Sequence, residues 1–161
     1  MKDDILIREM IPADRNFIMK SILQHYRHSS PHVKQIPDAI YFDAHHYLIG
    51  KVMRYANNFV RIACLKDDPE IVFGFCWGNF DPETIHYLYV KKAFRRMGIA
   101  RLLYESVFDN DIDLYYTHHT KEAAFLMHKY EQLTFNPYLL NGDLWKLTQA
   151  DGAVGPRSHR I

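Results

Sequence analysis

The sequence predicts an α/β (α+β) domain in which a mixed central sheet of about seven strands is covered by four helices. Short runs of β-branched and aromatic residues alternate in the manner of strands, and between them lie segments whose apolar residues recur at helical spacing. The chain has 161 residues, of which 48% are hydrophobic, enough for one domain with a sizeable core. The expected order of elements is β-α-α-β-β-β-α-β-α-β-β.

The N-terminal half is expected to contain a strand, two helices and a β-hairpin. Pro12 and Asp14 are typical of a helix start, and Pro31 ends that helix. Alternating apolar residues predict two hairpin strands on either side of a polar turn at 66–70. The predicted elements are a strand at 5–10, a helix at 12–29, a helix at about 38–55, and strands at 59–64 and 71–80.

The C-terminal half is expected to alternate strands and helices before it ends in a hairpin. The turn of that hairpin is the dipeptide Asn141-Gly142, which favours a two-residue turn. We expect residues 1–149 to form the domain and the Gly-, Pro- and polar-rich residues 150–161 to be a tail, flexible or held by a partner chain. The predicted elements are strands at 84–90 and 113–119, helices from 99 and at 121–133, and hairpin strands at 135–140 and 143–148.

A short segment between a predicted strand and the following helix combines small and basic residues. Gly98 and Ala100 leave room for a ligand to approach the backbone, where unpaired N–H groups and the helix dipole favour an anion. Arg95, Arg96 and Arg101 add positive charge. The segment indicates a pyrophosphate site, although a similar pattern also occurs as a packing glycine in an ordinary strand-to-helix connection.

The pattern Arg, two residues, Gly, one residue, Gly or Ala, filled here by Arg95, Gly98 and Ala100, resembles motif A of the GCN5-related N-acetyltransferases (GNAT). The order of predicted elements matches that family through residue 149. The resemblance implies that acetyl-CoA or a related acyl-CoA binds with its pantetheine along the strand edge and its pyrophosphate on the loop. The cofactor-binding residues it implies are Leu88, Tyr89, Val90, Arg95, Arg96, Gly98, Ile99, Ala100 and Arg101.

The resemblance also implies a catalytic acid. Attack of an amine on a thioester needs a base for the amine and benefits from an acid for the departing thiolate. Family members commonly have a tyrosine five residues before a phenylalanine near the end of the last long helix, and Tyr130 and Phe135 have that spacing. Tyr130 is therefore the expected acid, although it would also fit as a core residue on the apolar stripe of its helix.

His86 is the expected base. It lies four residues before Val90, where the resemblance to the serotonin N-acetyltransferases places a strand histidine. An imidazole titrates near neutrality and can accept a proton directly or through water. His118 and His119, at the end of the neighbouring strand, are competing bases, and His86 could instead be a hydrogen-bonded structural residue.

These expectations describe an acetyl-CoA-dependent N-acetyltransferase that moves an acetyl group to a primary amine by direct attack in a ternary complex. The acceptor is expected to be a small molecule or a protein. Aromatic residues and carboxylates of the two N-terminal helices and the last hairpin would suit a small cationic or aromatic amine, or could simply belong to the core. They are Tyr26, Tyr41, Phe42, Tyr47, Tyr138, Asp38 and Asp43.

Two segments, residues 86–100 and 135–140, look like small acetyltransferase-like proteins of tailed bacteriophages. This resemblance supports a second hypothesis, in which the chain is a GNAT-fold structural or interaction protein of a phage-type assembly without catalysis. A homo-oligomer or a virion partner chain would then hold the C-terminal tail. A phage-encoded enzyme would act in the host cytoplasm, whereas an assembly protein would be found in the virion.

Composition excludes several other classes of protein. The net charge of +1 argues against a general nucleic-acid binder or a membrane-surface protein, and no apolar stretch is long enough to cross a bilayer. Met1 leads through three polar residues into a strand, so no signal peptide is expected. Cys64 and Cys76 fit as small buried residues, which favours a reducing cytoplasm. The ten histidines show no recognisable metal-ligand spacing, so no native metal is expected.

Overall fold

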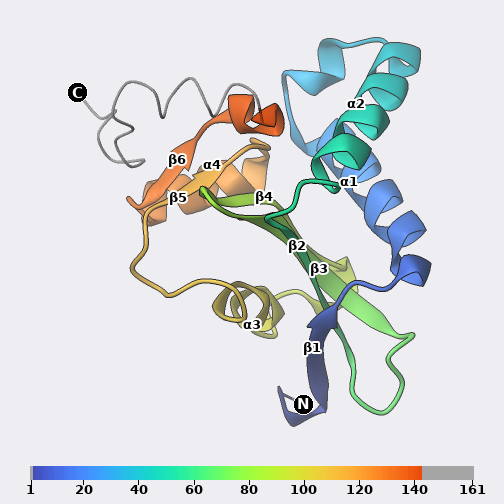
Figure 1. Cartoon of the computed structure of the whole chain (residues 1–161), viewed down its shortest axis with the longest axis vertical. Coiled ribbons are helices and arrows are strands. Elements are labelled where there is room, and N and C mark those ends of the chain that lie inside the picture. Colours follow the sequence, from blue (N-terminus) through green and yellow to red (C-terminus); the bar gives the residue numbers. More distant parts are fainter. Residues whose placement is uncertain (1, 143–161) are drawn as a thin grey trace.

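The computed structural model describes residues 2–142, which contain six strands in one mixed sheet. The strands are β1 Ile5–Glu9, β2 Asn58–Leu65, β3 Val72–Phe80, β4 Glu83–Val90, β5 Leu114–Tyr116 and β6 Leu133–Phe135. They lie side by side in chain order, as Figure 1 shows, with β1 to β4 antiparallel and β4 to β6 parallel. This is the expected fold class, with one strand fewer in the described residues than expected.

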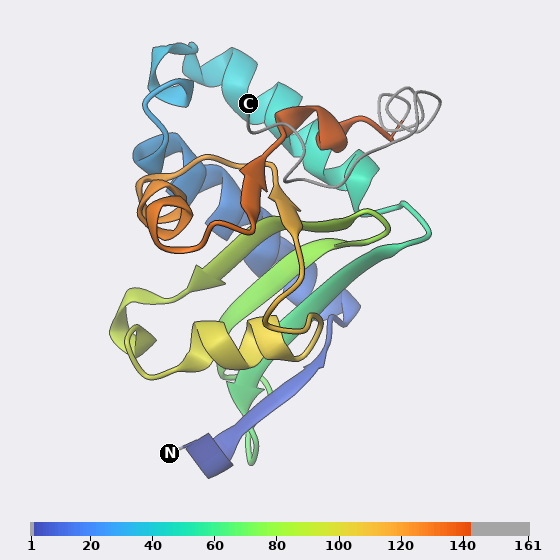
Figure 2. The ribbon, with the colours of Figure 1, turned by 90° about the vertical axis from the view of Figure 1, so that its left-hand side faces the viewer.

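Four α-helices accompany the sheet: α1 Arg15–Ser29, α2 Asp38–Val52, α3 Ile99–Glu105 and α4 Lys121–Lys129. In Figure 2, α3 lies in front of the strands and α1 passes behind them. Side chains of β2 pack on both faces of the sheet. Val60 and Ile62 belong to the apolar cluster of α1 and α2. Phe59 and Ala63 belong to the apolar cluster of α3. The alternation predicted for this strand is therefore confirmed.

The C-terminal elements differ from the predicted ones. The helix expected at 121–133 ends at Lys129, and β5 covers only part of the expected strand at 113–119. The expected seventh strand at 143–148 and the tail at 150–161 lie outside the described residues.

The strand predicted at 135–140 is wrong, because β6 ends at Phe135 and a 3-10 helix follows at Pro137–Leu140. Pro137 fixes φ and has no N–H to donate to a neighbouring strand. Asn136 Oδ1 accepts a hydrogen bond from Tyr138 N at 3.2 Å, which closes a turn. Local side-chain hydrogen bonding therefore prevails over the apolar residues that suggested a strand.

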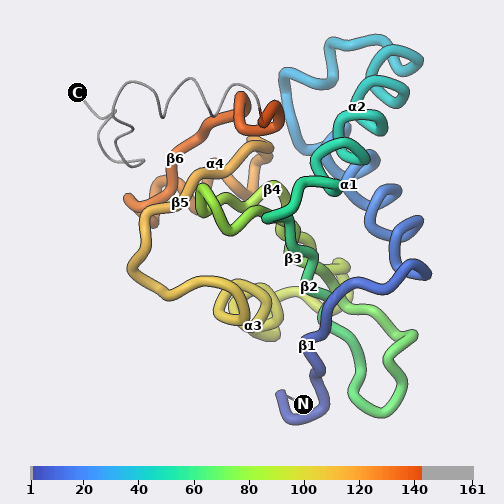
Figure 3. The backbone as a smooth tube through the Cα atoms, viewed as in Figure 1, coloured from blue at the N-terminus to red at the C-terminus, as the bar shows by residue number. Residues whose placement is uncertain are grey.

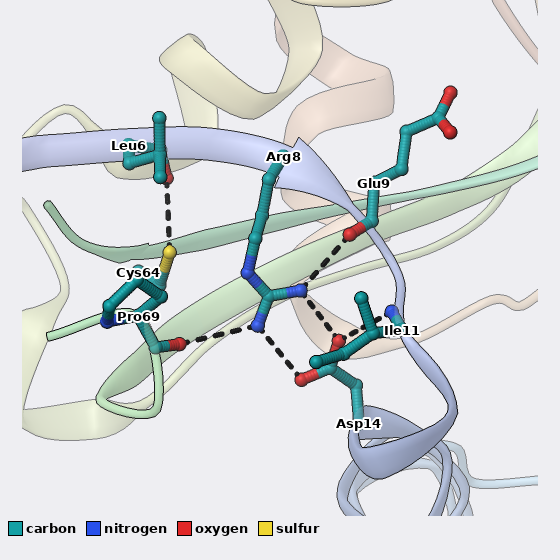
Figure 4. A network of polar contacts seen from close by, with 7 residues as sticks. All are labelled: Leu6, Arg8, Glu9, Ile11, Asp14, Cys64 and Pro69. Atoms are coloured by element: carbon teal, nitrogen blue, oxygen red, sulfur yellow. Dashed lines mark hydrogen bonds and ion pairs between the residues drawn. The ribbon is translucent and has the colours of Figure 1, made fainter.

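An ion pair between Arg8 and Asp14 holds the end of β1 to the start of α1 (Figure 4). The guanidinium donates to both carboxylate oxygens of Asp14, at 2.7 and 3.0 Å, and also to Pro69 O at 3.2 Å. Ile11 N donates to the same carboxylate at 2.9 Å. Pro69 lies in the loop between β2 and β3, which Figure 3 shows at the N-terminal end of the molecule. The Arg8–Asp14 ion pair thus connects three segments: the end of β1, the start of α1 and the loop between β2 and β3.

Substitution of Asp14 should measure this contribution. Partial burial favours the neutral acid, but the hydrogen bonds from Arg8 and Ile11 nevertheless lower the pKa of Asp14. A lowered folded-state pKa stabilises the fold above the unfolded pKa of about 3.9, and this stability is lost as the pH falls through the folded pKa. Asp14→Asn should therefore cost about 2 kcal/mol of unfolding free energy at pH 7, with a smaller difference below pH of about 4.

Urea unfolding of the wild type and the variant at both pH values is the measurement. Asp38→Asn is the matched control, because Asp38 also forms an ion pair, 2.6 Å from Arg27, but with a side chain that is 74% exposed. That variant should change stability by less than about 1 kcal/mol. Equal losses of unfolding free energy in the two variants would show that the buried ion pair stabilises the fold no more than the exposed one does.

Two findings bear on the class of protein. Within residues 2–142, no helix is long and apolar enough to cross a membrane, and no group of three or more His, Cys, Asp or Glu side chains is arranged to hold a metal ion. Cys64 and Cys76 are buried and not joined by a disulfide. Burial raises the pKa of Cys76 to about 12, so this thiol is protonated at neutral pH.

Candidate active site

Strands β4 and β5 pair over only two residues and then separate. Thr84 lies beside Tyr115 and Ile85 beside Tyr116, after which β5 ends while β4 continues to Val90. A cleft of about 460 Å³ opens beyond this point, lined by β4, the loop that follows it, α3, α4 and the end of β5. The separation of the two strands leaves one edge of β4 beside this cleft.

All nine residues expected to bind the cofactor line the cleft. Strand β4 contributes Leu88, Tyr89 and Val90, which pair with β3 on their other edge; the loop contributes Arg95, Arg96 and Gly98; and α3 contributes Ile99, Ala100 and Arg101. Residues predicted from a short sequence motif therefore form one continuous wall.

The loop before α3 bends through two residues in the left-handed region. Gly98 has φ of 82° and immediately precedes the first helical residue, Ile99, while Arg96 has φ of 64°. Arg95 Nε donates to Val90 O at 2.9 Å, which ties the loop to the end of β4. A side chain at position 98 would strain the backbone, so the glycine of the motif is required by the local conformation.

Positive charge is concentrated along this loop. Arg95, Arg96 and Arg101 all line the cleft, and Lys2 Cε lies 3.4 Å from the point that a Cβ atom at position 98 would occupy. Arg101 is partly neutralised by Glu105, whose Oε1 accepts from its Nε at 2.6 Å. The loop is therefore suited to an anionic ligand.

A β-bulge in β4 determines where His86 lies. Trp77 of β3 pairs with Tyr87, and the next residue, Gly78, pairs with Ile85, so His86 is an extra residue in β4. As a result Ile85 and Tyr87 pack in different apolar clusters, although residues two apart normally share a face. His86 is 1% exposed, its ring centre is 4.6 Å from that of Trp77, and it lines the cleft.

Thr117 connects His86 to His118. Its Oγ1 lies 3.0 Å from His86 Nδ1 and 2.9 Å from His118 Nδ1, so one hydroxyl serves two imidazoles. Burial lowers the pKa of His86 to about 3 and holds that of His118 well below its usual value, so both rings are neutral at pH 7. His86 Nε2 is buried and has no hydrogen-bond partner in the described part of the chain.

The other two expected catalytic residues do not line the cleft. His119 lies 3.0 Å from Tyr116 Oη through its Nδ1 and packs on the rings of Tyr116 and Phe135. Tyr130 follows the last residue of α4 and is 40% exposed, with Lys129 Nζ 5.3 Å from its ring centre. The hydrogen bond that Arg101 donates to Glu105 is the main cause of the raised pKa of Arg101, and Tyr130 makes a smaller electrostatic contribution in the same direction.

Three further cleft residues were not expected from the sequence. His25 of α1 lies 2.5 Å from Tyr87 Oη through its Nδ1 and 3.4 Å from Glu122 Oε1 through its Nε2. All three line the cleft. Burial lowers the pKa of His25 more than the Glu122 carboxylate raises it. No local pattern could have identified this group, because its members come from α1, β4 and α4.

Comparison with protein families identifies the class of protein. The family model "Acetyltransferase (GNAT) family" matches residues 19–129, which is more than half of the chain. The chain therefore belongs to the GNAT acetyltransferase family. It is an N-acetyltransferase, and acetyl-CoA is the acyl donor that this family uses. A search of the curated proteins gives no match.

Solved structures share the fold at low sequence identity. A candidate acetyl transferase from Pyrococcus furiosus is 14% identical, with a TM-score of 0.54 over 92% of this chain and 91% of that chain. A candidate acetyltransferase from Clostridium difficile 630 is 18% identical, with a TM-score of 0.51 over 79% of this chain and 87% of that chain. At such identities the likeness shows the fold alone.

The residues of the cleft fit acetyl-CoA. The basic loop around Gly98 offers three arginines to phosphate groups, and the glycine leaves space that a larger residue would fill. The edge of β4 beyond Ile85 has no strand partner on the cleft side among residues 2–142, so it is available to amide groups of a ligand. The wall includes apolar residues such as Leu126 and Leu133.

Gly98→Glu should abolish measurable binding of acetyl-CoA. The new side chain would strain a backbone with φ of 82° and would place a negative charge beside the arginines of the loop. Isothermal titration with acetyl-CoA is the measurement, with circular dichroism to verify the fold. Gln35→Glu adds the same charge at an exposed residue outside the cleft and should bind as the wild type does. Wild-type affinity in a folded Gly98→Glu variant would exclude the loop as the binding site.

Proposed function

We propose that this enzyme transfers the acetyl group of acetyl-CoA to a primary amine by direct attack in a ternary complex. The observation that supports this proposal most strongly is a neutral imidazole, His86, whose ring lines the same cleft as the arginine loop and whose buried Nε2 has no hydrogen-bond partner within residues 2–142. A neutral imidazole can accept a proton from an amine. No cleft residue is needed as a covalent nucleophile.

The roles of the residues follow from their positions. Arg95, Arg96 and the loop around Gly98 would hold the phosphates, and Leu88 to Val90 would orient the pantetheine arm through their backbone. Bound acetyl-CoA supplies an electrophilic thioester carbonyl. His86 accepts the proton of the amine through Nε2, while its Nδ1 remains hydrogen-bonded to Thr117.

We assign Tyr130 as the acid that protonates the departing thiolate. Its support is the family spacing to Phe135 and its position after α4, near Arg101 of the cleft wall. The ring is 40% exposed and is therefore not fixed in the core. Tyr116 is a neighbouring phenol that lines the cleft already.

The acceptor is proposed to be a small-molecule or protein amine. Of the aromatic residues expected at the acceptor site, Tyr41 belongs to the core, because it is 3% exposed and its hydroxyl donates to Leu23 O at 2.7 Å. Tyr47 and Tyr138 are 67% and 70% exposed and remain available for contact with an acceptor. Glu122 provides one carboxylate in the cleft, which would favour a cationic amine.

We favour catalysis over an assembly role. A protein that used the fold only to bind a partner would not need the arginine-rich loop, the glycine at φ of 82° and the open strand edge together. The tail that would contact a partner chain lies outside the described residues. A cytoplasmic location is proposed on the two unpaired cysteines.

His86→Gln tests the base. Glutamine keeps a polar side chain but has no basic nitrogen, so kcat for acetylation of the best amine in a panel should fall about 10²-fold or more. Affinity for acetyl-CoA should stay close to that of the wild type, because His86 lies outside the phosphate loop. His119→Gln is the matched control and should retain wild-type kcat, since His119 does not line the cleft. A fully active His86→Gln enzyme would remove His86 from the mechanism.

Tyr130→Phe tests the acid. Loss of the hydroxyl should lower kcat about 10²-fold and leave acetyl-CoA affinity nearly unchanged, with a smaller loss for thioesters whose thiol is more acidic. The comparison of acetyl-CoA with an activated acetyl thioester is the measurement. Tyr116→Phe is the parallel variant. Suppose that Tyr116→Phe shows the larger loss of kcat, that this loss depends on the acidity of the leaving thiol, and that Tyr130→Phe is active. Tyr116 is then the acid, and Tyr130 is not.

A further inference from the structure

Four side chains form a continuous hydrogen-bonded chain beneath the cleft. His86 Nδ1 lies 3.0 Å from Thr117 Oγ1, Thr117 Oγ1 lies 2.9 Å from His118 Nδ1, and His118 Nε2 lies 2.9 Å from His45 Nε2. The members come from β4, the segment after β5 and α2. The arrangement therefore crosses from the strand that lines the cleft to a helix on the outside of the molecule.

We infer that this chain is a proton relay that carries the proton taken up by His86 to solvent at His45. The inference rests on the proposed function, because it supplies the outlet for the proton of the acceptor amine. His86 is the catalytic member, and Thr117, His118 and His45 act through it.

The reaction requires such an outlet. A C–N bond forms and the C–S bond breaks, and the ammonium group of the acceptor loses two protons. One of them is balanced by the proton that the thiolate gains, so each turnover releases one proton. His86 cannot store that proton, because burial lowers its pKa to about 3. The proton must therefore leave His86 as it arrives.

The relay moves one proton at each link. His86 gains a proton on Nε2 and passes the proton of Nδ1 to Thr117 Oγ1. The hydroxyl passes its own proton to His118 Nδ1, and His118 Nε2–H passes its proton to His45 Nε2. His45 Nδ1 then releases a proton to water. After product release the links shift back: His45 Nδ1 takes up a proton from solvent and His86 Nε2 gives one to water in the cleft, which restores the starting tautomers. The relay thus removes the proton from the acceptor during the chemical step, and the proton released per turnover leaves through the emptied cleft.

The two ends of the chain suit this direction. His86 Nε2 lies at the cleft end, where it is buried without a hydrogen-bond partner in residues 2–142. His45, at the other end, is only partly buried. Between them the rings pack on aromatic side chains, with ring centres 4.6 Å apart for His86 and Trp77 and 4.7 Å apart for His118 and Tyr26. The links are thus shielded from competing water.

The chain imposes a fixed pattern of tautomers. Thr117 has one hydroxyl proton, so one of its two imidazole partners donates to it and the other accepts from it. The link between the two Nε2 atoms likewise needs one donor and one acceptor. If neutral His118 carries its proton on Nε2, His86 and His45 must therefore carry theirs on Nδ1. If His118 carries it on Nδ1, the other two must carry theirs on Nε2. Any other combination of tautomers would break at least one of the three hydrogen bonds.

The first test removes the central hydroxyl. Thr117→Val replaces it by a methyl group of similar size and should lower kcat about tenfold to a hundredfold, with unchanged affinity for acetyl-CoA. Thr117→Ser keeps the hydroxyl and should restore most of kcat. Thr84→Val is the matched control, because Thr84 is also a fully buried threonine, with its hydroxyl on Pro82 O at 2.8 Å and outside the relay. It should retain wild-type kcat.

Solvent isotope effects separate a relay from a structural role. The kcat of the wild-type enzyme should be lower in D₂O than in H₂O. Its dependence on the deuterium fraction of the solvent should indicate that several protons move in the rate-limiting step. For Thr117→Val, the dependence of kcat on the deuterium fraction should indicate that only one proton moves. His45→Ala should lose activity that added imidazole restores. A Thr117→Val enzyme with wild-type kcat, or an isotope effect unchanged by the substitution, would overturn the relay.

The second test needs no turnover. Ring ¹⁵N spectra of the free protein should show His86, His118 and His45 neutral at pH 7, with His118 in the opposite tautomer from the other two. The same tautomer in His86 and His118 would overturn the relay. Failure of the proposed function looks different: wild-type protein would then acetylate no amine, whereas an active wild type with an equally active Thr117→Val variant would refute the relay alone.

Discussion

The candidate active site depends on one extra residue in β4. Without the bulge at His86, regular alternation would place this side chain with Leu88 on the side of α3. With it, His86 joins Trp77 and the rings beneath α1 and α2, while Leu88 and Val90 still face α3. The bulge also coincides with the last β4–β5 pair at Ile85. A single irregularity therefore places an imidazole at the point where β4 and β5 separate.

The sequence predicted the parts of this site that depend on local conformation. Gly98 was identified because a strand-to-helix turn with an open backbone needs a residue without Cβ, and its φ of 82° agrees. The arginines nearby were identified from their charge. Elements with clear periodicity, such as α1 and β2, were predicted to within a few residues. The strand at 113–119 was predicted too long, and the one wrongly predicted element lies after Lys129, where Asn136 and Pro137 impose a turn on a segment of apolar residues.

The parts that could not be predicted depend on residues distant in sequence. Nothing near His45 in the sequence indicates that its ring lies 2.9 Å from His118, because α2 reaches that position only when it packs on the sheet. The group of His25, Tyr87 and Glu122 is hidden for the same reason. The bulge is hidden as well, since the residues around His86 read as a regular strand and only the pairing with Gly78 reveals the extra residue.

Charge is separated along the cleft in a way that suits acetyl transfer. The arginine loop is exposed, so its cations stay solvated until they meet the anionic part of the donor. The opposite end consists of rings that burial keeps uncharged, including His86 and His45, whose pKa is lowered to about 4. An imidazolium there would be poorly solvated and would repel the ammonium group of an acceptor. Burial therefore keeps these imidazoles neutral, so a cationic acceptor would meet no positive charge from them at this end of the cleft.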